Sequence, residues 1–194
     1  ELGVGIGAYR EEFEALQPGE RTPRGKIVEE GVRALQKLFT DDRATFNGEF
    51  FRYKDVELFP KPLQERIPIY FGGNNVNQLY RTATLGDGWL PAGLPLDRIT
   101  ADIVHLRQLC TNAGRDFSEI AIAPQYIALV DHNHDRAVAR FTSSQMHKHL
   151  VSLTQSTLKE QAGISMADAN LVGTPAEVVE KARALKAAGV THLL

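Results

Sequence analysis

The sequence contains a single cysteine, Cys110, among its 194 residues. One thiol cannot form a disulfide bond within the chain, and sparing use of cysteine is typical of a reducing compartment, so a cytoplasmic location is expected. Cys110 lies on the apolar stripe of a segment with helical periodicity. This placement favours a buried structural thiol over a nucleophile.

Long apolar runs and blocks of like charge are also missing. No apolar run approaches the roughly 18–20 residues that a membrane-spanning helix needs, so no membrane partner is expected. The 22 Lys and Arg residues are scattered among 24 Asp and Glu residues, and the net charge is −2. No basic stripe therefore predicts binding of nucleic acid. The start, Glu1-Leu2-Gly3, lacks the basic and apolar regions of a signal peptide.

The patterns of common hydrolytic and metal sites are not found either. His132 and His134, like His147 and His149, are two residues apart, which on a helix points the rings to different faces. No cysteine or paired carboxylate completes a ligand set, so no metal site is expected. Exposed positions are the favoured interpretation of these histidines, and the alternative is that His147 or His149 faces a substrate pocket. A nucleophile elbow, a Ser-His-Asp set and a P-loop are absent.

What the sequence does contain is an alternation of short apolar runs with segments of helical periodicity. This rhythm predicts an α/β fold of parallel strands covered by helices. Because a strand is expected at both ends, we interpret the chain as part of a (β/α)8 barrel; a doubly wound open sheet is the rival. The helices are expected at 26–39, 75–85, 97–111 and 175–188, and the strands at 2–7, 68–71, 89–92, 120–130 and 190–194. The strand at 120–130 is expected to be kinked at Pro124.

Two segments depart from this rhythm. Asn47-Gly48 lies between aromatic and β-branched residues and predicts a β-hairpin insertion at about 43–59. The stretch from 135 to 161 is helical but poorly periodic, and a Gly163-Ile164-Ser165-Met166 break follows it. We therefore expect a lid over the active face at about 140–170.

The clearest candidate for a ligand site is Gly72-Gly73-Asn74, where a buried strand ends and a helix begins. Such a turn presents backbone N–H groups at the positive end of the helix dipole, which suits a phosphate. The alternative is a tight strand-to-helix turn with no ligand. The helical residue Arg81 is expected to pair with an acidic neighbour such as Asp87, and Trp89 is expected to fill the core.

Gly3, Gly5 and Gly7 alternate at the end of the first strand, so they remove side chains from one face of it. A planar ring or a phosphate tail could lie against this bare backbone, and close strand–helix packing is the alternative. The spacing differs from that of a nicotinamide dinucleotide fingerprint, which needs a third glycine and a later acidic residue.

In their order and spacing, these motifs resemble the luciferase-like monooxygenases, the superfamily of bacterial luciferase. The resemblance covers nearly the whole chain. It implies a (β/α)8 TIM barrel, of which this chain holds strands 4–8 only. The motifs that carry it are Gly3–Gly7, Glu12–Leu16, Arg24-Gly25, Glu29-Glu30, Thr45–Phe50, Pro60-Lys61-Pro62, Pro68–Asn74, Arg81 with Ala83, Gly86–Trp89 and Gly173-Thr174-Pro175.

The resemblance also implies reduced FMN or the deazaflavin coenzyme F420 as cofactor. It places Gly3, Gly5, Gly7, Gly72, Gly73 and Asn74 in cofactor binding, with Gly72, Gly73 and Asn74 at the phosphate. Several FMN-dependent members hold that phosphate with an arginine after the fourth strand, where this sequence has Ile6. An apolar residue cannot neutralise a dianion, so of the two cofactors F420 is favoured.

The resulting hypothesis is a flavin- or F420-dependent oxidoreductase or monooxygenase that acts on a small organic substrate. The alternative is a non-catalytic flavin-binding protein of the same fold. The catalytic and substrate residues are not assigned. The catalytic residues are expected in the first three strands, and substrate specificity is expected from variable loops such as 91–97 and 131–172. Without those strands the chain is expected to be inactive, and its unpaired strand edges favour association with a second copy as a homodimer.

Overall fold

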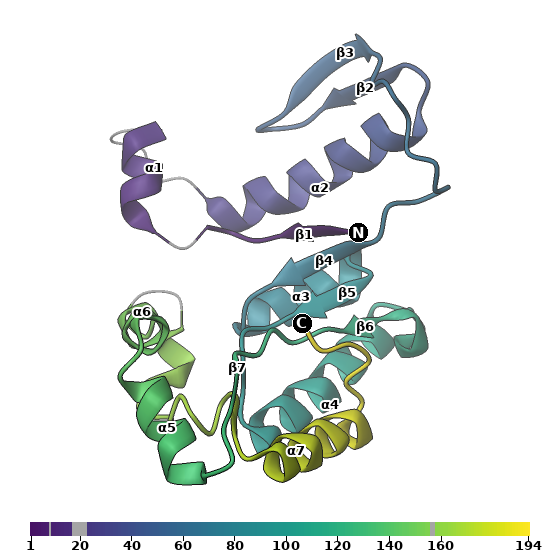
Figure 1. Ribbon diagram of the computed structural model, residues 1–194. Helices are drawn as coiled ribbons and strands as arrows, with labels where there is room; N and C mark the ends of the chain where they lie inside the picture. The colour runs from purple at the N-terminus through teal and green to yellow at the C-terminus, as the bar shows by residue number, and fades with distance from the viewer. Residues whose placement is uncertain (8, 17–22, 156–157) are drawn as a thin grey trace. The chain divides into compact units, whose positions relative to one another are not determined.

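The structure is a computed structural model that describes residues 1–7, 9–16, 23–155 and 158–194. The chain divides into two compact units, Glu1–Tyr70 and Phe71–Leu194, and each is described by itself. The first unit holds β1 (Leu2–Val4), α1 (Arg10–Leu16), α2 (Arg24–Thr40), β2 (Ala44–Asn47), β3 (Arg52–Val56) and the start of β4 (Ile69–Gly72), as labelled in Figure 1.

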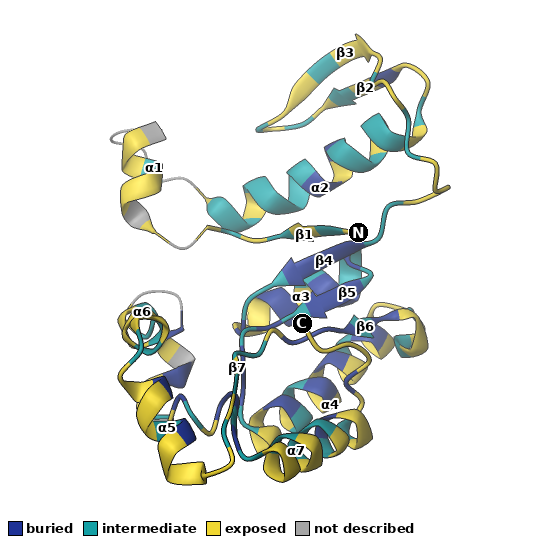
Figure 2. Ribbon diagram, in the orientation of Figure 1, coloured by how far each residue is buried: buried dark blue, intermediate teal, exposed yellow. Residues whose placement is uncertain are grey.

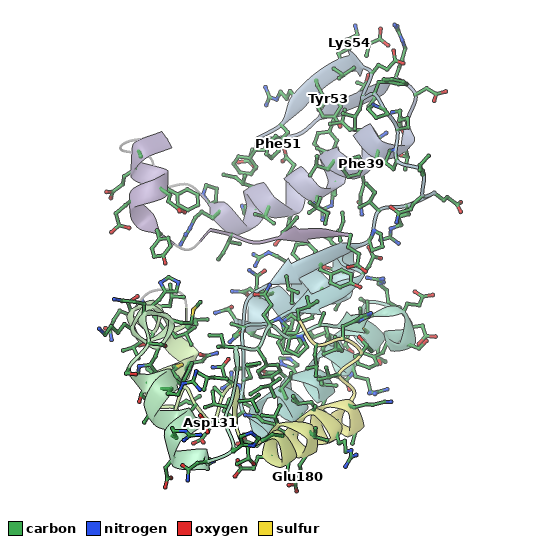
Figure 3. The ribbon with its side chains drawn as sticks, viewed as in Figure 1. Phe39, Phe51, Tyr53, Lys54, Asp131 and Glu180 are labelled. Atoms are coloured by element: carbon green, nitrogen blue, oxygen red, sulfur yellow. The ribbon has the colours of Figure 1, made fainter. Side chains whose placement is uncertain are left out.

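In the first unit, the antiparallel hairpin β2–β3 packs on α2 (Figure 1). The hydroxyl of Tyr53 donates to the carbonyl of Ala34 at 2.6 Å, and the ring of Phe51 meets the helix at Gly31. Figure 3 shows these hairpin rings on the helix side. The hairpin insertion predicted from Asn47-Gly48 is present. Its pairing ends at Asn47 opposite Arg52, so the turn has four residues rather than two.

The carboxylate of Glu30 fixes this four-residue turn. It accepts hydrogen bonds from the backbone N–H groups of Glu49, Phe50 and Phe51, at 2.9, 2.8 and 2.7 Å. Desolvation works against ionisation, but the three N–H donors prevail and lower the pKa of Glu30. The side chain of Glu30 on α2 thus holds a turn that is longer than the one suggested by Asn47-Gly48.

The second unit contains the end of β4 and two sets of parallel strands. β4, β5 and β6 are neighbours in one sheet, where Trp89 of β5 pairs with Ile122 of β6, and β7 and β8 pair separately. The remaining elements are α3 (Val76–Leu85), β5 (Gly88–Leu90), α4 (Leu96–Asn112), the 3-10 turn η1 (Phe117–Glu119), β6 (Ala121–Ile122), β7 (Ala128–Val130), α5 (His134–Thr142), α6 (Gln145–Leu153), the 3-10 turn η2 (Lys159–Gln161), β8 (Leu171–Gly173) and α7 (Pro175–Ala188).

The core of the second unit lies where β5 and β6 meet α3, α4 and α7 (Figure 2). Trp89 is fully buried there, as expected from the sequence, and so is Cys110, whose thiol pKa is raised by burial. Arg115 closes the carboxyl end of α3 by donating to the carbonyls of Thr82, Ala83 and Gly86. α7 begins with the capping box of Thr174 and Glu177 and ends at Gly189, with φ +109°.

Two strand predictions were wrong. Residues 120–130 do not form one strand, because Pro124 has no N–H for a ladder and the chain turns there into a second sheet. The segment 190–194 is not a regular strand, although it lies beside residues 122–126. The N–H of Leu194 donates to Pro124 at 3.1 Å, and that of Tyr126 donates to Leu194 at 2.8 Å.

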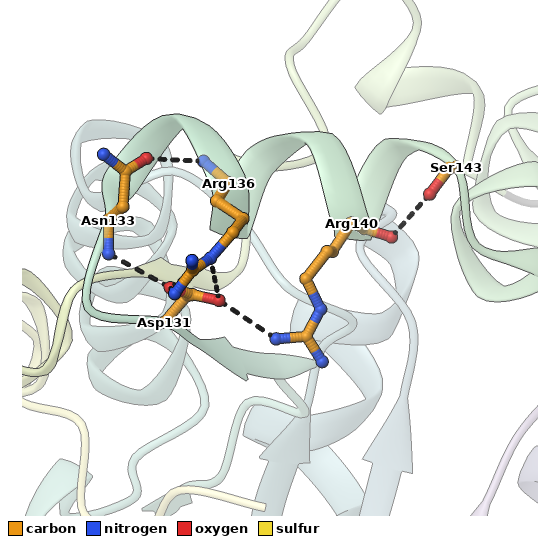
Figure 4. A network of polar contacts seen from close by, with 5 residues as sticks. All are labelled: Asp131, Asn133, Arg136, Arg140 and Ser143. Atoms are coloured by element: carbon orange, nitrogen blue, oxygen red, sulfur yellow. Dashed lines mark hydrogen bonds and ion pairs between the residues drawn. The ribbon is translucent and has the colours of Figure 1, made fainter.

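The turn from β7 into α5 is held by charge (Figure 4). The Asp131 carboxylate accepts from Nε of Arg136 at 2.8 Å and from Nη1 of Arg140 at 3.1 Å, while Oδ1 of Asn133 caps the helix. Arg136, together with the Asn133 N–H, holds the pKa of Asp131 well below its usual range. The start of α5 is therefore fixed in place by a carboxylate with two arginines.

Candidate functional site

The turn after β4 is held by main-chain and indole hydrogen bonds. Gly73 has φ +117°, which favours glycine, and its N–H donates to the carbonyl of Leu90 at 3.1 Å. Its own carbonyl accepts from Nε1 of Trp89 at 2.9 Å. The expectation of free N–H groups along this turn was therefore wrong at Gly73, because the neighbouring strand β5 uses that donor.

In the part of the chain that the structure describes, Asn74 has an N–H donor without a partner, whereas the backbone N–H of Gly73 is already used. The Asn74 side chain is 97% buried, with 3% exposed, and Oδ1 accepts from the N–H of Ala92 at 2.9 Å. That bond fixes the amide orientation and directs Nδ2 away from Ala92. Among the residues that the structure describes, this buried Nδ2 has no hydrogen-bond partner. A buried donor without a partner costs about 1–3 kcal/mol, so its presence needs an explanation.

The helix α3 begins two residues after Asn74. Asn75 is its N-cap, with Oδ1 accepting from the N–H of Asn77 at 2.9 Å. The positive end of the helix dipole and the unpartnered amide therefore belong to the same short turn, Gly72–Asn75. A negatively charged oxygen is the group that both features would stabilise.

The segment 91–94, which follows β5, is fixed from two sides. The carbonyl of Gly93 accepts from Nε2 of Gln161 at 2.6 Å, and that of Leu94 accepts from the hydroxyl of Tyr126 at 3.0 Å. Burial raises the pKa of Tyr126 to about 12, so this hydroxyl remains a donor at neutral pH. A Cβ at position 93 would lie 2.6 Å from the carbonyl oxygen of Ala169, which explains the glycine.

The three remaining candidate glycines belong to the first unit. Gly3 lies in β1 and is exposed, and a Cβ at Gly5 would meet nothing within 4 Å. Gly7 has φ +78°, and a Cβ there would lie 2.6 Å from the ring of Phe13. Open space at Gly5 agrees with a bare strand face, whereas Gly7 is explained by its own packing.

Arg24 is a further candidate, which the sequence reasoning did not name as a site residue. Its Nη1 donates to the carbonyl of Gly7 at 3.1 Å and lies 3.5 Å from that of Ile6, and its guanidinium stands 4.9 Å from the centre of the Phe13 ring. A cation therefore stands beside Ile6, although position 6 itself is apolar. The only signal in the sequence was the Arg24-Gly25 pair.

The other candidates have local roles. Nη1 of Arg81 donates to Oε1 of Gln78 at 3.1 Å, and the carbonyl of Asp87 accepts from Ala121 at 2.9 Å. His134 contacts Glu177 at 3.1 Å, whereas His147 lines a cavity that is described below. Within residues 1–7, 9–16, 23–155 and 158–194, no group of three or more His, Cys, Asp or Glu side chains could hold a metal ion. No helix in this part of the chain is both long and apolar enough to cross a bilayer.

Comparison with known proteins places this geometry in context. The family model described as luciferase-like monooxygenase matches residues 1–192. An FMNH2-dependent dimethylsulfone monooxygenase of Pseudomonas putida is 28% identical over the whole chain, which covers 59% of that protein. An F420-dependent glucose-6-phosphate dehydrogenase of Nakamurella multipartita is 25% identical, again over the whole chain, with 60% of that protein covered. The chain thus spans about three fifths of the length of these relatives.

The fold is similar to that of a solved F420-dependent secondary alcohol dehydrogenase, in complex with an F420–acetone adduct. The TM-score is 0.79 at 20% identity, with 98% of this chain and 62% of that chain covered. At this identity the likeness concerns the fold alone.

Proposed function

Because the chain belongs to the luciferase-like monooxygenase family, we propose that it holds the cofactor-binding half of an oxidoreductase that uses reduced FMN or F420. Its substrate is a small organic molecule. The strands are assigned to positions 4–8 of a (β/α)8 barrel, with the hairpin as an insertion and residues 140–170 as a lid. Partial coverage of the relatives, at 59% and 60%, supports this assignment.

The observation that carries the proposal is the buried, unpartnered Nδ2 of Asn74. A phosphate oxygen on the Gly72–Asn74 turn would accept from Nδ2 and lie at the positive end of α3. Both FMN and F420 carry a phosphate, so one turn suits either cofactor. A charge-assisted hydrogen bond of this kind contributes about 1.5–3 kcal/mol.

The charge around Ile6 does not separate the two cofactors. The phosphate of FMN is a dianionic monoester, and that of F420 is a monoanionic diester, so an uncharged turn favours F420. Arg24, however, brings a guanidinium to the carbonyls of Ile6 and Gly7. The proposal therefore retains both cofactors and assigns Gly3, Gly5 and Gly7 to contact with either one.

The bound cofactor would supply the redox chemistry, a hydride or an oxygen atom for the substrate. The chain's own residues bind and orient it: Asn74 donates to the phosphate, and the hydrogen bond from Trp89 keeps Gly73 in its turn. Gln161 and Tyr126 hold the segment 91–94 in place through its carbonyl groups.

The test is a fluorescence titration of the chain with FMN and with F420, side by side. Asn74→Asp keeps an acceptor for Ala92 but replaces the donor with a negative oxygen. The expected result is saturable binding by the unaltered chain, and affinity at least about tenfold weaker in the variant, because one charge-assisted bond is lost. Unchanged affinity of Asn74→Asp would overturn the assignment.

The matched control is Gln108→Glu, which makes the same amide-to-carboxylate change at an exposed position of α4. It is expected to bind nearly as the unaltered chain does. Asn74→Leu, which has a similar size and no donor, replaces Asn74→Asp if the buried carboxylate prevents folding. The thermal midpoints of all variants are measured in parallel.

We also propose that the 194-residue chain alone does not turn over substrate, since about two fifths of the length of its relatives lies outside it. Steady turnover by the purified chain with either reduced cofactor would contradict this.

A further inference from the structure

A cavity of about 330 Å³ lies in the second unit among α5, α6 and the segment 161–167. This volume is at the lower end of the range for small-molecule sites, about 300–1,000 Å³. The walls are mainly apolar and are formed by Val138, Val151, Ile164 and Met166. A ligand here would bury its carbon skeleton against these side chains.

Two of the three hydroxyl groups of the cavity have no proton left for a ligand. The third, that of Ser165, accepts from the N–H of Asp168 at 3.3 Å and keeps its proton as a donor. Oγ1 of Thr142 donates to the carbonyl of Val138 at 3.0 Å, and Oγ1 of Thr154 donates to that of Val151 at 2.7 Å. Each threonine hydroxyl has one proton, which its own helix already uses. These two threonine oxygen atoms can therefore only accept a hydrogen bond from a ligand.

Gln161 adds a buried acceptor. Its side chain is 2% exposed, and Nε2 donates to the carbonyl of Gly93, which fixes the amide orientation because a carbonyl can only accept. The bond leaves Oε1 as the acceptor of this amide group. The ring of His147 packs edge-on against Phe141 at 5.3 Å, which sets it at the cavity wall.

Charge narrows the ligand class further. The lining contains no Asp, Glu, Lys or Arg, so an ammonium or a carboxylate would lose its hydration without an opposite charge. A hydroxyl group, which is neutral and can both donate and accept, matches these acceptors and the Ser165 donor. We propose that this cavity is a binding site for a small, mostly apolar alcohol whose hydroxyl donates to Oε1 of Gln161.

The site is connected to the turn after β4. Gln161 holds the carbonyl of Gly93, and the N–H of the preceding residue, Ala92, donates to Oδ1 of Asn74. Binding of an alcohol at Gln161 therefore perturbs the segment 92–94 as well as the cavity. The proposal itself does not depend on any cofactor.

The test uses cyclohexanol and its methyl ether, methoxycyclohexane, as probes. The ether has a similar skeleton and no donor. In ¹H–¹⁵N and methyl spectra of the chain without cofactor, cyclohexanol should give saturable shifts at Val138, Ile164 and Met166, and at the amides of 92–94. The ether should bind about tenfold more weakly, the effect of one unmade hydrogen bond of about 1.4 kcal/mol. Equal binding of the two probes, or no saturable shift at the cavity, overturns the proposal.

A filled cavity provides the second test. Val138→Phe places a ring in the cavity and should abolish the cyclohexanol shifts. The control Val104→Phe makes the same change on α4, where Val104 is 64% exposed, and should leave them intact. Ile164→Phe fills the cavity from the opposite wall if Val138→Phe does not fold. The site is contradicted if a filled variant folds and still binds cyclohexanol as the unaltered chain does. If neither variant folds, the comparison of cyclohexanol with its ether is the deciding test.

Discussion

Nε1 of Trp89 donates to the carbonyl of Gly73 at 2.9 Å, so the one tryptophan of the chain holds the turn on which the proposed phosphate site depends. The indole is fully buried between β5 and the helices that cover it. A core side chain thus also serves the site, because its polar edge reaches the end of the neighbouring strand.

Trp89→Phe is expected to weaken both folding and cofactor binding. The variant leaves the carbonyl of Gly73 without its donor and opens space in the core, so the free energy of unfolding should fall by about 2–4 kcal/mol. Urea denaturation measures the loss. Phe141→Leu, a change at another buried aromatic ring of the same unit, is the control and should leave cofactor affinity unchanged. If the Trp89→Phe variant bound the cofactor with unchanged affinity, the indole would not contribute to the proposed site.

Gly5→Ala tests the bare face of the first strand. A Cβ at this position meets nothing within 4 Å, so the free energy of unfolding should change by less than about 0.5 kcal/mol. If the cofactor lies on this face, the methyl group should still reduce its affinity. Gly7→Ala is the contrasting variant: with φ +78° and the Phe13 ring at 2.6 Å, it should lose stability outright. If Gly5→Ala kept both full stability and full cofactor affinity, Gly5 would not be a cofactor contact.

The His134–Glu177 pair predicts a pH dependence of stability. The hydrogen bond with Glu177 raises the pKa of His134 above its ordinary value of 6.5. The N–H of Thr174, followed by His134, lowers the pKa of Glu177 to about 2. The histidine contribution is therefore complete below pH 6.5 and is lost as the pH rises through the raised pKa. The glutamate contribution is present above 4.5 and is lost as the pH falls toward 2.

His134→Gln should remove the first of these effects. The thermal midpoint of the unaltered chain is expected to fall between pH 6 and 8.5 by more than that of the variant, measured by circular dichroism. Because both side chains are about half exposed, the difference should shrink in high salt. Identical pH profiles for the two chains would show that this pair does not contribute.

The lid prediction for residues 140–170 concerns slow opening rather than fast motion. α6 contains no buried residue, whereas α7 buries Leu185 and has the capping box at its start. Amide hydrogen exchange within 145–153 should therefore be faster than within 175–188. Equal protection of the two segments would contradict a lid.

Local chemistry accounts for the elements that the sequence predicted well. α2, α3, α4 and α7 lie within about two residues of their predicted bounds, because apolar periodicity and caps such as Thr174 act over a few residues. The strands at 120–130 and 190–194 were predicted wrongly. A kink at Pro124 was expected, but an apolar run does not show which sheet it joins.

The site was predictable only in part. Gly72-Gly73-Asn74 was chosen for its backbone, but the donor of Gly73 is used by β5, and the unpartnered group is the side chain of Asn74. These outcomes depend on contacts of Asn74 with Ala92 and of Gly73 with Leu90, which lie 18 and 17 residues away and leave no local pattern. Arg24 was missed for the same reason, because its carbonyl partners lie 17 and 18 residues earlier.

The most direct test of the cofactor site is the side-chain amide resonance of Asn74. In a titration of ¹⁵N-labelled chain with FMN and with F420, the account predicts that the two Nδ2 protons shift in proportion to bound cofactor, because one of them gains a phosphate acceptor. The backbone amide of Ala92 should shift much less, since its bond to Oδ1 is already made. Saturation by either cofactor with the Nδ2 signals unmoved would contradict the account.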